Sequence, residues 1–419
     1  MHAEYILLLN KKKIINDPVY GFISIPTELV YDLIDHPYFQ RLRYIRQVGM
    51  THLVYPGALH TRFHHALGAM HLMGLAIETL CNKGTDISPE EKEGLIIAIL
   101  LHDIGHGPFS HALEHTIVEE ISHEDISIML MDKLNAEFGG QLSLAISIFR
   151  GEYHKKFLHQ LVSSQLDMDR MDYLNRDSFF TGVSEGVISS DRIIKMLTVK
   201  NDMVVVEEKG IYSIEKFLIA RRLMYWQVYL HKTVIAAEQL LCKIFCRARE
   251  LALAGTRFPL TPALAYFLNT EIDRTEFMAN PEHLKVFALL DDTDVMAAVK
   301  IWAGSTDWVL ATLCHNFINR RLYHVDITSD SPDTVWVEEL RRKAQQQYGL
   351  NEHDASYFVF TDSIRNNAYN KGDGSIHILK KDGSVIDITL ASDNSNLEAL
   401  SKTVKKHILC YTKELALNV

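Results

Sequence analysis

Histidine and aspartate residues recur in three short stretches of this chain, at spacings that suit metal chemistry. The stretches run from Arg62 to Gly68, from Leu101 to Gly107 and from Leu166 to Tyr173. A single His-Asp pair arises often by chance, whereas a His, a His-Asp pair and an Asp on three separate helices rarely occur together. Imidazole and carboxylate groups jointly hold divalent metals that activate water against phosphate esters. The three stretches therefore predict a metal site.

The candidate ligands lie on segments with helical periodicity. The unbroken apolar run from Leu95 to Leu101 is typical of a buried helix, and it ends directly in a His-Asp pair. Two polar side chains delivered into a low-dielectric interior need partners, and one metal ion serves both. We therefore predict one divalent ion, Fe, Mn, Zn, Ni, Co or Mg. Its predicted ligands are His65, His102, Asp103 and Asp169.

A purely structural alternative exists for two of these ligands. His65 would then be a hydrogen-bonded core histidine, and Asp169 would pair with Arg170 or Arg176 on its own helix. For either ligand alone, this alternative is the stronger interpretation. Together with the His-Asp pair it requires several coincidences at once, so we favour the metal site.

The bulk composition is that of a globular protein with an acidic balance. The chain has 419 residues, 47% of them hydrophobic and 23% charged, which is ordinary for a folded protein with a large core. Its net charge of -10 argues against a nucleic-acid coat, so a polyanionic ligand has to be held by a local cluster of Arg and Lys. No apolar stretch is long enough for a secretory core or a bilayer span, so we expect a cytoplasmic protein without a membrane partner.

Periodicity predicts a mostly helical chain with small β-hairpins up to about residue 253. One hairpin is predicted over residues 12–25, and a second strand pair joins 203–206 to 210–213. Helical periodicity begins after residue 25. Further helices are predicted at 62–82, 89–104, 108–121, 123–138, 141–149, 154–176, 189–198 and 214–253.

A boundary is predicted between Gly255 and Pro262, and a smaller α+β lobe follows it. This lobe holds no cluster of ligand or nucleophile residues, so we predict that residues 254–419 serve packing and assembly. Its predicted helices are 261–270, 281–289, 291–304, 307–320 and a final one at 396–413. Its predicted strands are 357–360 and the hairpin of 376–379 with 385–388.

In their order along the chain, these motifs resemble the HD superfamily of metal phosphohydrolases. The resemblance extends to the deoxynucleoside triphosphate triphosphohydrolase branch, which includes dGTPase-like enzymes. It covers residues 12–250, and it rests on the stretches 35–47, 55–58, 62–68, 102–111, 122–124, 167–177 and 229–232. It implies an HD-domain helical core over residues 1–253. It also implies a homo-oligomer, because similar enzymes assemble as dimers of dimers.

The resemblance assigns roles to individual residues. The four predicted ligands match the metal ligands of the family. His111 with Glu114 matches its catalytic dyad, and His106 and His123 match its phosphate-facing histidines. The implied triphosphate contacts are Arg62, Arg170, Tyr173 and Arg221, and the implied sugar contacts are Gln47, Asp177 and Tyr229. A guanine-nucleotide activator site is implied at Asp35, Gln40 and Arg43.

Three positions depart from the vertebrate member of this branch. Glu114 stands where that relative has Asp, His64 where it has Glu, and Leu230 where it has Gln. The first change adds one methylene to the dyad carboxylate. The other two bear on base preference or on positioning, so the resemblance leaves the preferred base open.

The implied reaction converts a dNTP and water into a deoxynucleoside and inorganic triphosphate. The metal would lower the pKa of water and neutralise charge that develops on phosphorus. His111 is suited to protonating the 5′-oxygen, because His titrates near neutrality, and Glu114 one helical turn away would orient it. Arg62, Arg170 and Arg221 would clamp the triphosphate with forked hydrogen bonds.

Competing interpretations stay open at this stage. The same ligands suit an HD hydrolase that acts on a nucleoside monophosphate or a cyclic nucleotide, although such an enzyme has no use for three phosphate-facing Arg. A third hypothesis is a non-catalytic nucleotide-sensing module, and a nuclease is a weaker fourth. Taken singly, each Arg is better explained as an ion pair. Ordinary core packing explains Tyr173, Tyr229 and Gln47 almost as well as ligand binding does.

Overall fold

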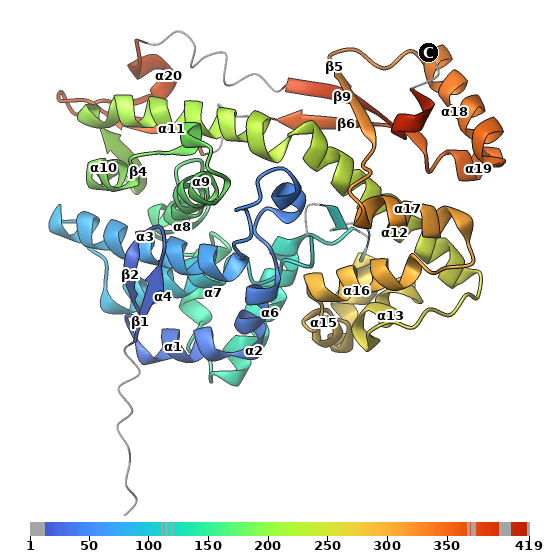
Figure 1. Ribbon diagram of the computed structural model, residues 1–419. Helices are drawn as coiled ribbons and strands as arrows, with labels where there is room; N and C mark the ends of the chain where they lie inside the picture. The colour runs from blue at the N-terminus through green and yellow to red at the C-terminus, as the bar shows by residue number, and fades with distance from the viewer. Residues whose placement is uncertain are drawn as a thin grey trace, which may run out of the picture.

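Helices make up most of this structure, and three small β-sheets accompany them (Figure 1). The computed structural model describes residues 13–109, 112–113, 116, 118, 120–366, 369, 374–393 and 404–416. The predicted fold class, a mostly α core with small hairpins followed by an α+β lobe, is confirmed. None of the helices in these ranges is both long and apolar enough to cross a bilayer.

The part of the chain up to residue 253 contains two antiparallel hairpins and a group of packed helices. The hairpins are β1 (Ile14–Asp17) with β2 (Gly21–Ser24), and β3 (Leu197–Lys200) with β4 (Met203–Glu207). The helices are α1 (Glu28–Asp35), α2 (Pro37–Gln40), α3 (Arg62–Asn82), α4 (Pro89–Leu101), α6 (His123–Glu137), α7 (Ser143–Phe149), α8 (Lys156–Val162), α9 (Met168–Thr181), α10 (Ser190–Met196), α11 (Ile211–Met224) and α12 (Lys232–Leu253). Short 3-10 turns cover Arg41–Tyr44, Gly49–Leu53, Ser184–Gly186 and Glu208–Gly210.

Three of these helices position the predicted ligands: His65 lies in α3, Asp169 lies in α9, and His102 with Asp103 directly follows α4. α4 begins behind the capping pair of Ser88 and Glu91, and it is buried on every side from Leu95 to Leu101. α9 begins behind the N-cap Asp167 and ends at Gly182, whose φ is 76°. α3 packs against both α4 and α9. The ligand-bearing segments of the three helices therefore meet in the interior.

Two predicted helices are interrupted. The helix predicted at 154–176 is divided into α8 and α9, because Asp167 caps a new helix and accepts from the Ser164 N–H at 2.8 Å. The helix predicted at 214–253 is divided into α11 and α12 by a π-helical turn at Tyr225–Tyr229. Such turns are found frequently at functional sites.

The second predicted hairpin has the wrong partner strand. β4 pairs with β3, which precedes it, through a two-residue turn in which Asn201 and Asp202 have φ of 51° and 59°. Asn and Asp tolerate this conformation, and such turns match the twist of the flanking strands. Residues 210–213 instead lead into α11. Of the helix predicted at 108–121, residues 110, 111, 114, 115, 117 and 119 lie outside the described residues.

The remainder of the chain combines helices with two sheets. Its helices are α13 (Pro262–Leu268), α14 (Arg274–Ala279), α15 (Pro281–Phe287), α16 (Asp292–Trp302), α17 (Trp308–Ile318), α18 (Thr334–Tyr348), α19 (Glu352–Ala355) and α20 (Ile388–Ala391). The strands are β5 (His324–Thr328), β6 (Val359–Asn366), β7 (His377–Leu379), β8 (Val385–Asp387) and β9 (Val404–Tyr411), and a 3-10 turn covers Lys413–Leu415. The predicted β7–β8 hairpin is confirmed.

The final helix predicted at 396–413 is wrong from residue 404 on, and residues 396–403 lie outside the described residues. Its described portion forms β9, the central strand of a sheet with the order β5-β9-β6. β9 is antiparallel to both neighbours, and its residues from Ile408 to Tyr411 are buried. Hydrogen bonds to two neighbouring strands and burial of this apolar run outweigh the helical tendency of the preceding Leu and Lys residues.

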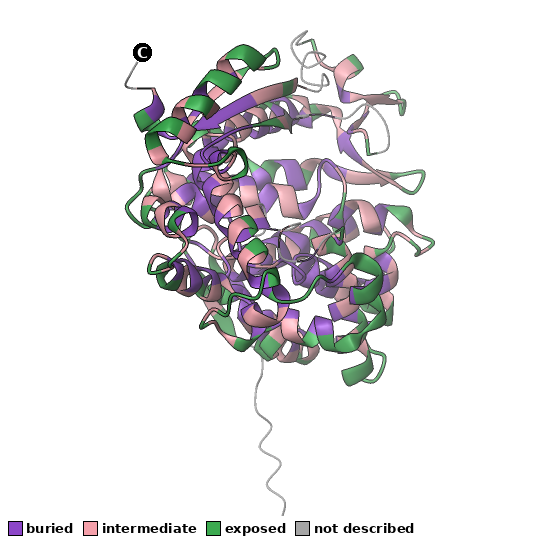
Figure 2. Cartoon of the chain, turned by 90° about the vertical axis from the view of Figure 1, so that its right-hand side faces the viewer, coloured by how far each residue is buried: buried purple, intermediate pink, exposed green. Residues whose placement is uncertain are grey.

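Several contacts join the two parts of the chain. β7 lies parallel to β4, so the later segment completes a four-stranded sheet begun by the earlier one. The buried Arg41 donates to the carbonyl oxygens of Ile104 and Leu290, at 2.9 and 3.0 Å. Figure 2 shows that buried residues fill the interior, whereas exposed residues gather on the outer turns. The division at residue 253 stays a prediction, and these contacts show that the two parts pack together.

Shortening a side chain of α4 tests its burial. Leu100 has no exposed surface, so Leu100→Ala should lower the free energy of unfolding by about 2–5 kcal/mol. The control is Leu390→Ala, because Leu390 is 76% exposed and its truncation should change the free energy by less than about 0.5 kcal/mol. Urea denaturation followed by circular dichroism measures both, and equal losses would contradict the burial of α4.

Candidate metal centre

Four donor atoms from three segments converge in the interior. The Nε2 atoms of His65 and His102 lie 3.3 Å apart. Oδ1 of Asp169 lies 3.1 Å from the first of these atoms and 3.5 Å from the second. The carboxylate of Asp103 lies 3.7 Å from His65 Nε2 and 3.4 Å from His102 Nε2. Ligands at about 2.1 Å from one shared ion are separated by about 3.0–3.4 Å, so this spacing suits a metal.

The other nitrogen of each ring shows which atoms face the centre. His102 Nδ1 lies 2.6 Å from the Ile99 carbonyl oxygen, which only accepts, so Nδ1 carries the proton of the neutral ring. His65 Nδ1 lies 2.7 Å from Asp172 Oδ2 and donates in the same way. Both Nε2 atoms therefore present lone pairs to two carboxylates. Four electron-rich atoms repel one another unless a cation lies among them, so the residues fit a divalent metal.

The pKa values of the cluster express the same demand for positive charge. Burial lowers the pKa of His65, but hydrogen bonds to Asp169 and Asp172 outweigh burial and raise this pKa to about 10. Burial alone would raise the pKa of Asp169, but the two histidines hold it well below its usual range. These directions show that the cluster favours positive charge at its centre.

Asp103 connects this cluster to a second group of donors. Its Oδ2 accepts from Arg62 Nη1 at 2.6 Å, and its Oδ1 lies 3.1 Å from His106 Nε2. The His106 ring stacks on His123, with the ring centroids 3.8 Å apart. Burial, together with Arg62, holds the pKa of His106 well below its usual value, so this ring is neutral. Donor atoms of Asp103, His106 and His123 lie within 4.8 Å of one another, close enough to share a cation.

The alternative pairing of Asp169 with a neighbouring Arg is wrong. Arg170 pairs with Asp167, the residue that caps its own helix. Arg176 pairs with Asp172 at 2.9 Å and with Asp17 at 2.7 Å. Both guanidinium groups therefore have other carboxylate partners, and Asp169 faces the two histidines.

A cavity of about 500 Å³ opens beside these ligands. Predicted site residues that line it include Asp103 and Asp169, the phosphate-facing candidates and the sugar-facing candidates. They are Gln47, Arg62, Asp103, His106, His123, Asp169, Arg170, Tyr173, Asp177, Arg221 and Tyr229. Val48, Thr51, Tyr225, Leu230 and Glu238 complete the wall and were not predicted from the sequence. His65 and His102 lie behind the wall and do not line it.

The π-helical turn between α11 and α12 fixes one side of this cavity. The Tyr229 hydroxyl donates to Asp177 Oδ2 at 2.6 Å, and Asp177 Oδ1 lies 2.8 Å from His60 Nε2. The rings of Tyr225 and Tyr229 meet edge to face, with centroids 5.2 Å apart. His60 and Tyr225 were missed from the sequence. The spacing of one helical turn between Tyr225 and Tyr229 is the signal that places both on one face.

His64 has a structural role at the start of α3. Its Nδ1 accepts from the Thr61 N–H at 3.2 Å, as a Glu does at the third position of a capping box. His64 thus takes part in capping this helix.

Some predicted residues lie elsewhere. His111 and Glu114 are outside the described residues. Asp35 and Arg43 are exposed on the surface, and Gln40 accepts from Arg43 Nε at 2.7 Å. These three are close in sequence and do not line the cavity.

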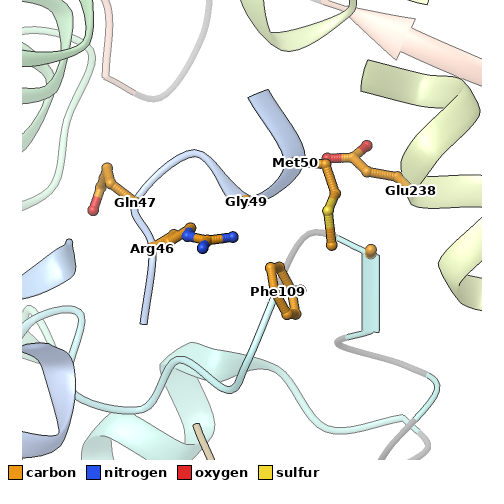
Figure 3. A pocket seen from close by; sticks show the side chains of 7 residues that line it. Arg46, Gln47, Gly49, Met50, Phe109 and Glu238 are labelled. Atoms are coloured by element: carbon orange, nitrogen blue, oxygen red, sulfur yellow. The ribbon is translucent and has the colours of Figure 1, made fainter. Parts of the chain in front are cut away.

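Glu238 also lines the cavity and was not predicted as a site residue. Figure 3 shows it extending from α12 toward a smaller hollow lined also by Arg46, Gln47, Gly49, Met50 and Phe109. Burial raises the pKa of this half-buried carboxyl to about 7. The sequence signal was a single charge within the apolar run from Val234 to Leu241.

Comparison with known proteins agrees with this geometry. Residues 62–177 match the HD domain family, and residues 188–256 match the HD associated region. YwfO of Bacillus subtilis is 32% identical over 97% of this chain and 94% of its own length. The deoxynucleoside triphosphate triphosphohydrolase SAMHD1 homolog of Dictyostelium discoideum is 32% identical over 57% of this chain and 50% of its own length. A crystal structure of a phosphohydrolase from Bacteroides thetaiotaomicron is 55% identical, with a TM-score of 0.93, over 96% of this chain and 100% of that chain.

Two glycines of α3 provide a test of the packing behind the metal ligands. A Cβ at Gly68 would lie 2.0 Å from Asp172 Oδ1 and 2.2 Å from Arg176 Nη2, so Gly68→Ala should lower the free energy of unfolding by about 1–3 kcal/mol and reduce bound metal. A Cβ at Gly74 would meet nothing within 4 Å, so Gly74→Ala should raise the free energy by about 0.5–1 kcal/mol. Urea denaturation and elemental analysis measure both effects. Unchanged metal content in Gly68→Ala would refute the close packing.

Glu238 predicts a dependence of stability on pH. The pKa of Glu238 in the folded protein is raised to about 7. The contribution of Glu238 to the free energy of unfolding is therefore fully present below its pKa in the unfolded chain, and it is lost as the pH rises through about 7. Glu238→Gln stays neutral, so it should raise Tm more at about pH 8 than at about pH 5. The exposed Glu152→Gln is the control and should change Tm equally at both. Differential scanning fluorimetry measures these differences, and an equal effect of Glu238→Gln at both pH values would contradict the raised pKa.

Proposed function

The chain belongs to the HD-domain phosphohydrolases, and from that membership we propose that it converts a deoxynucleoside triphosphate and water into a deoxynucleoside and inorganic triphosphate. The relative from Dictyostelium discoideum carries the name of this activity and matches 57% of the chain. The observation that carries the proposal is a single cavity that metal ligands, Arg side chains and the Tyr229–Asp177 pair all line. A nucleoside monophosphate has one phosphate, so it would leave some of the Arg side chains in the cavity without a partner.

The cavity holds cationic donors that the protein itself does not satisfy. Arg221 is 8% exposed, and neither its Nε nor its Nη1 has a hydrogen-bond partner in the described part of the chain. Arg170 Nε is likewise buried without a partner there, although its Nη1 pairs with Asp167. A buried, incompletely bonded guanidinium is unfavourable, and its fork matches phosphate oxygens. A row of three phosphates would supply the missing acceptors.

The metal ligands are His65, His102, Asp103 and Asp169, and a divalent cation held there supplies polarisation of a phosphoryl oxygen and a lower pKa for water. Arg62 keeps Asp103 in place through its 2.6 Å hydrogen bond. His106 and His123 lie on the same wall as Asp103, where imidazole N–H groups can donate to phosphate oxygens.

The deoxynucleoside leaves through its 5′-oxygen, which departs well only when it is protonated. By resemblance, we assign this protonation to His111 and the orientation of its ring to Glu114. The neighbouring residue Ala112 contacts α12, because the Cys242 S–H donates to its carbonyl oxygen at 2.8 Å. Cys242 lies one helical turn beyond Glu238 of the cavity wall.

The sugar would occupy the side of the cavity formed by the π-helical turn. The 2.6 Å hydrogen bond to Asp177 fixes the orientation of the Tyr229 ring, against which a deoxyribose would pack. Gln47 is 8% exposed, and its Oε1 has no hydrogen-bond partner among the described residues, so it can accept from a 3′-hydroxyl. A 2′-hydroxyl would meet the fixed ring of Tyr229.

The proposal extends to assembly and regulation. We assign Asp35, Gln40 and Arg43 to an activating nucleotide bound by a homo-oligomer. The Arg43 guanidinium lies 3.6 Å above the Phe63 ring, and Phe63 adjoins Arg62 in α3. A nucleotide that binds Arg43 would therefore influence the position of Arg62 through the Phe63 ring.

Product identification tests the reaction. The purified protein is incubated with each dNTP, singly and mixed, with Mg²⁺, Mn²⁺, Fe²⁺, Co²⁺, Ni²⁺ or Zn²⁺, and products are separated by ion-exchange chromatography. We expect intact triphosphate and the deoxynucleoside, and no products after EDTA treatment. A response to the mixture alone would indicate an activator. Release of orthophosphate or pyrophosphate only, or hydrolysis of monophosphates only, would refute the proposal.

Neighbouring arginines of α11 provide a matched pair for triphosphate binding. Arg221→Ala should lower kcat/KM for the preferred dNTP by roughly 10–100-fold, because charged hydrogen bonds contribute about 1.5–3 kcal/mol. Arg222→Ala is the control, because Arg222 is adjacent in sequence and does not line the cavity. It should change kcat/KM by less than about twofold. Steady-state kinetics decide, and equal effects of the two substitutions would exclude Arg221 as a substrate contact.

A further inference from the structure

A chain of buried charges runs from the metal ligand His65 to the N-terminal hairpin. His65 Nδ1 lies 2.7 Å from Asp172 Oδ2. Arg176 holds both oxygens of Asp172, with Nε to Oδ2 at 2.9 Å and Nη2 to Oδ1 at 3.0 Å. The remaining donor, Nη1, reaches Asp17 Oδ2 at 2.7 Å. His65, Asp172 and Arg176 have no exposed surface, and Asp17 is 7% exposed.

Asp17 is placed by the β1–β2 hairpin, outside the segment 62–177 that matches the HD domain. Its Oδ1 accepts from the Val19 and Tyr20 N–H groups, both at 2.9 Å, and this closes the turn. Its Oδ2 is thereby aimed at Arg176. One carboxylate thus has two separate tasks, one in the turn and one in the interior.

We propose that Asp17 is a positioning residue of the metal centre, which acts on His65 through Arg176 and Asp172. The juxtaposition is long-range, because Asp17 and Arg176 are 159 positions apart in the chain. The hairpin therefore belongs to the metal site, although it contributes no ligand.

The physical argument concerns how one guanidinium is shared. Two carboxylates and one guanidinium leave one net negative charge next to His65. Because Arg176 is divided between both carboxylates, Asp172 remains a strong acceptor for the His65 Nδ1–H. A strong acceptor at Nδ1 fixes the ring orientation and makes Nε2 a better metal ligand. Without Asp17, Arg176 would neutralise Asp172 alone and weaken its hold on the ring.

Gly68 makes this arrangement sterically feasible. The Asp172–Arg176 pair lies directly against α3 at this position, within 2.2 Å of where a Cβ would be. A larger residue at 68 would push the pair away from His65, which is on the same helix. The position of the pair is thus set from both sides, by α3 and by the hairpin.

The test is metal affinity measured directly. Asp17→Asn keeps the turn acceptor Oδ1 and removes the charge that Arg176 faces. Titration of the metal-free protein with Co²⁺ should show a dissociation constant about tenfold higher than that of the wild type. The visible absorption bands of bound Co²⁺ should also shift, because they report ligand geometry.

Asp307→Asn is the matched control. Asp307 also combines a backbone contact, Leu310 N–H to Oδ1 at 2.8 Å, with a forked contact to a guanidinium, that of Arg247, at 2.7 and 3.1 Å. It does not line the cavity. Asp307→Asn should lower Tm while the Co²⁺ dissociation constant and spectrum stay as in the wild type. A Co²⁺ affinity and spectrum of Asp17→Asn equal to those of the wild type would overturn the proposal.

A second variant covers the case in which Asp17→Asn does not fold. Arg176→Lys keeps the positive charge between the two carboxylates but removes the fork. It should also weaken Co²⁺ binding and shift the spectrum, and unchanged binding in this variant would equally overturn the proposal. These measurements do not depend on the identity of the nucleotide substrate. The absence of triphosphate among the products would refute the proposed reaction while leaving the role of Asp17 standing.

Discussion

Repulsion among closely spaced lone pairs is the constraint on which the centre of this structure depends. Two imidazole nitrogens lie 3.3 Å apart, and each of two carboxylates lies 3.1–3.7 Å from both of them, with the two histidines buried. Such a group is stable only around positive charge, supplied by a metal or by protons. The surrounding fold holds the ligands in this arrangement even though they repel each other. The buried α4 and the fixed Nδ1 hydrogen bonds achieve this.

The cavity gathers three arginines into one wall, where four carboxylates also lie. The chain carries a formal charge of -10, yet the wall of the cavity includes Arg62, Arg170 and Arg221. Local clustering of this kind draws an anion to one place while the remaining surface repels it. Glu238 also lines the smaller hollow, and its carboxylate repels an anion there when it is ionised. The three arginines therefore favour an anion in the cavity, whereas the Glu238 carboxylate disfavours one in the smaller hollow.

The later part of the chain also shapes the region around the site. Asp292, at the start of α16, accepts from the N–H groups of Arg46 and Phe109, both at 3.0 Å. Phe109 has a φ of 44°, a conformation that bulky residues adopt only when their surroundings impose it. Arg41 donates to the carbonyl oxygens of both Ile104, in the loop that follows α4, and Leu290. These contacts mean that the helices beyond residue 253 hold loops next to the ligands.

Local sequence was sufficient to predict most of the helices and four side chains that the fold brings together. His65, His102, Asp103 and Asp169 were predicted, because helical period and an unbroken apolar run are properties of neighbouring residues. It failed for β9, whose strand conformation depends on the distant β5 and β6, and for the break at Tyr225–Tyr229. Secondary structure of such segments is decided by tertiary partners.

The tertiary structure decided how the ligands are held. The proton on His65 Nδ1 is directed by Asp172, 107 positions away, and Asp17 reaches the same network across 159 positions. The same holds for His60, which contacts Asp177 of the cavity wall, and for Glu238, which lines the cavity. No local spacing in the sequence specifies either position. The sequence by itself determined which residue types can bind a metal, since that follows from their chemistry. Only folding determined which of their atoms face it, because that choice depends on hydrogen-bond partners far away in the chain.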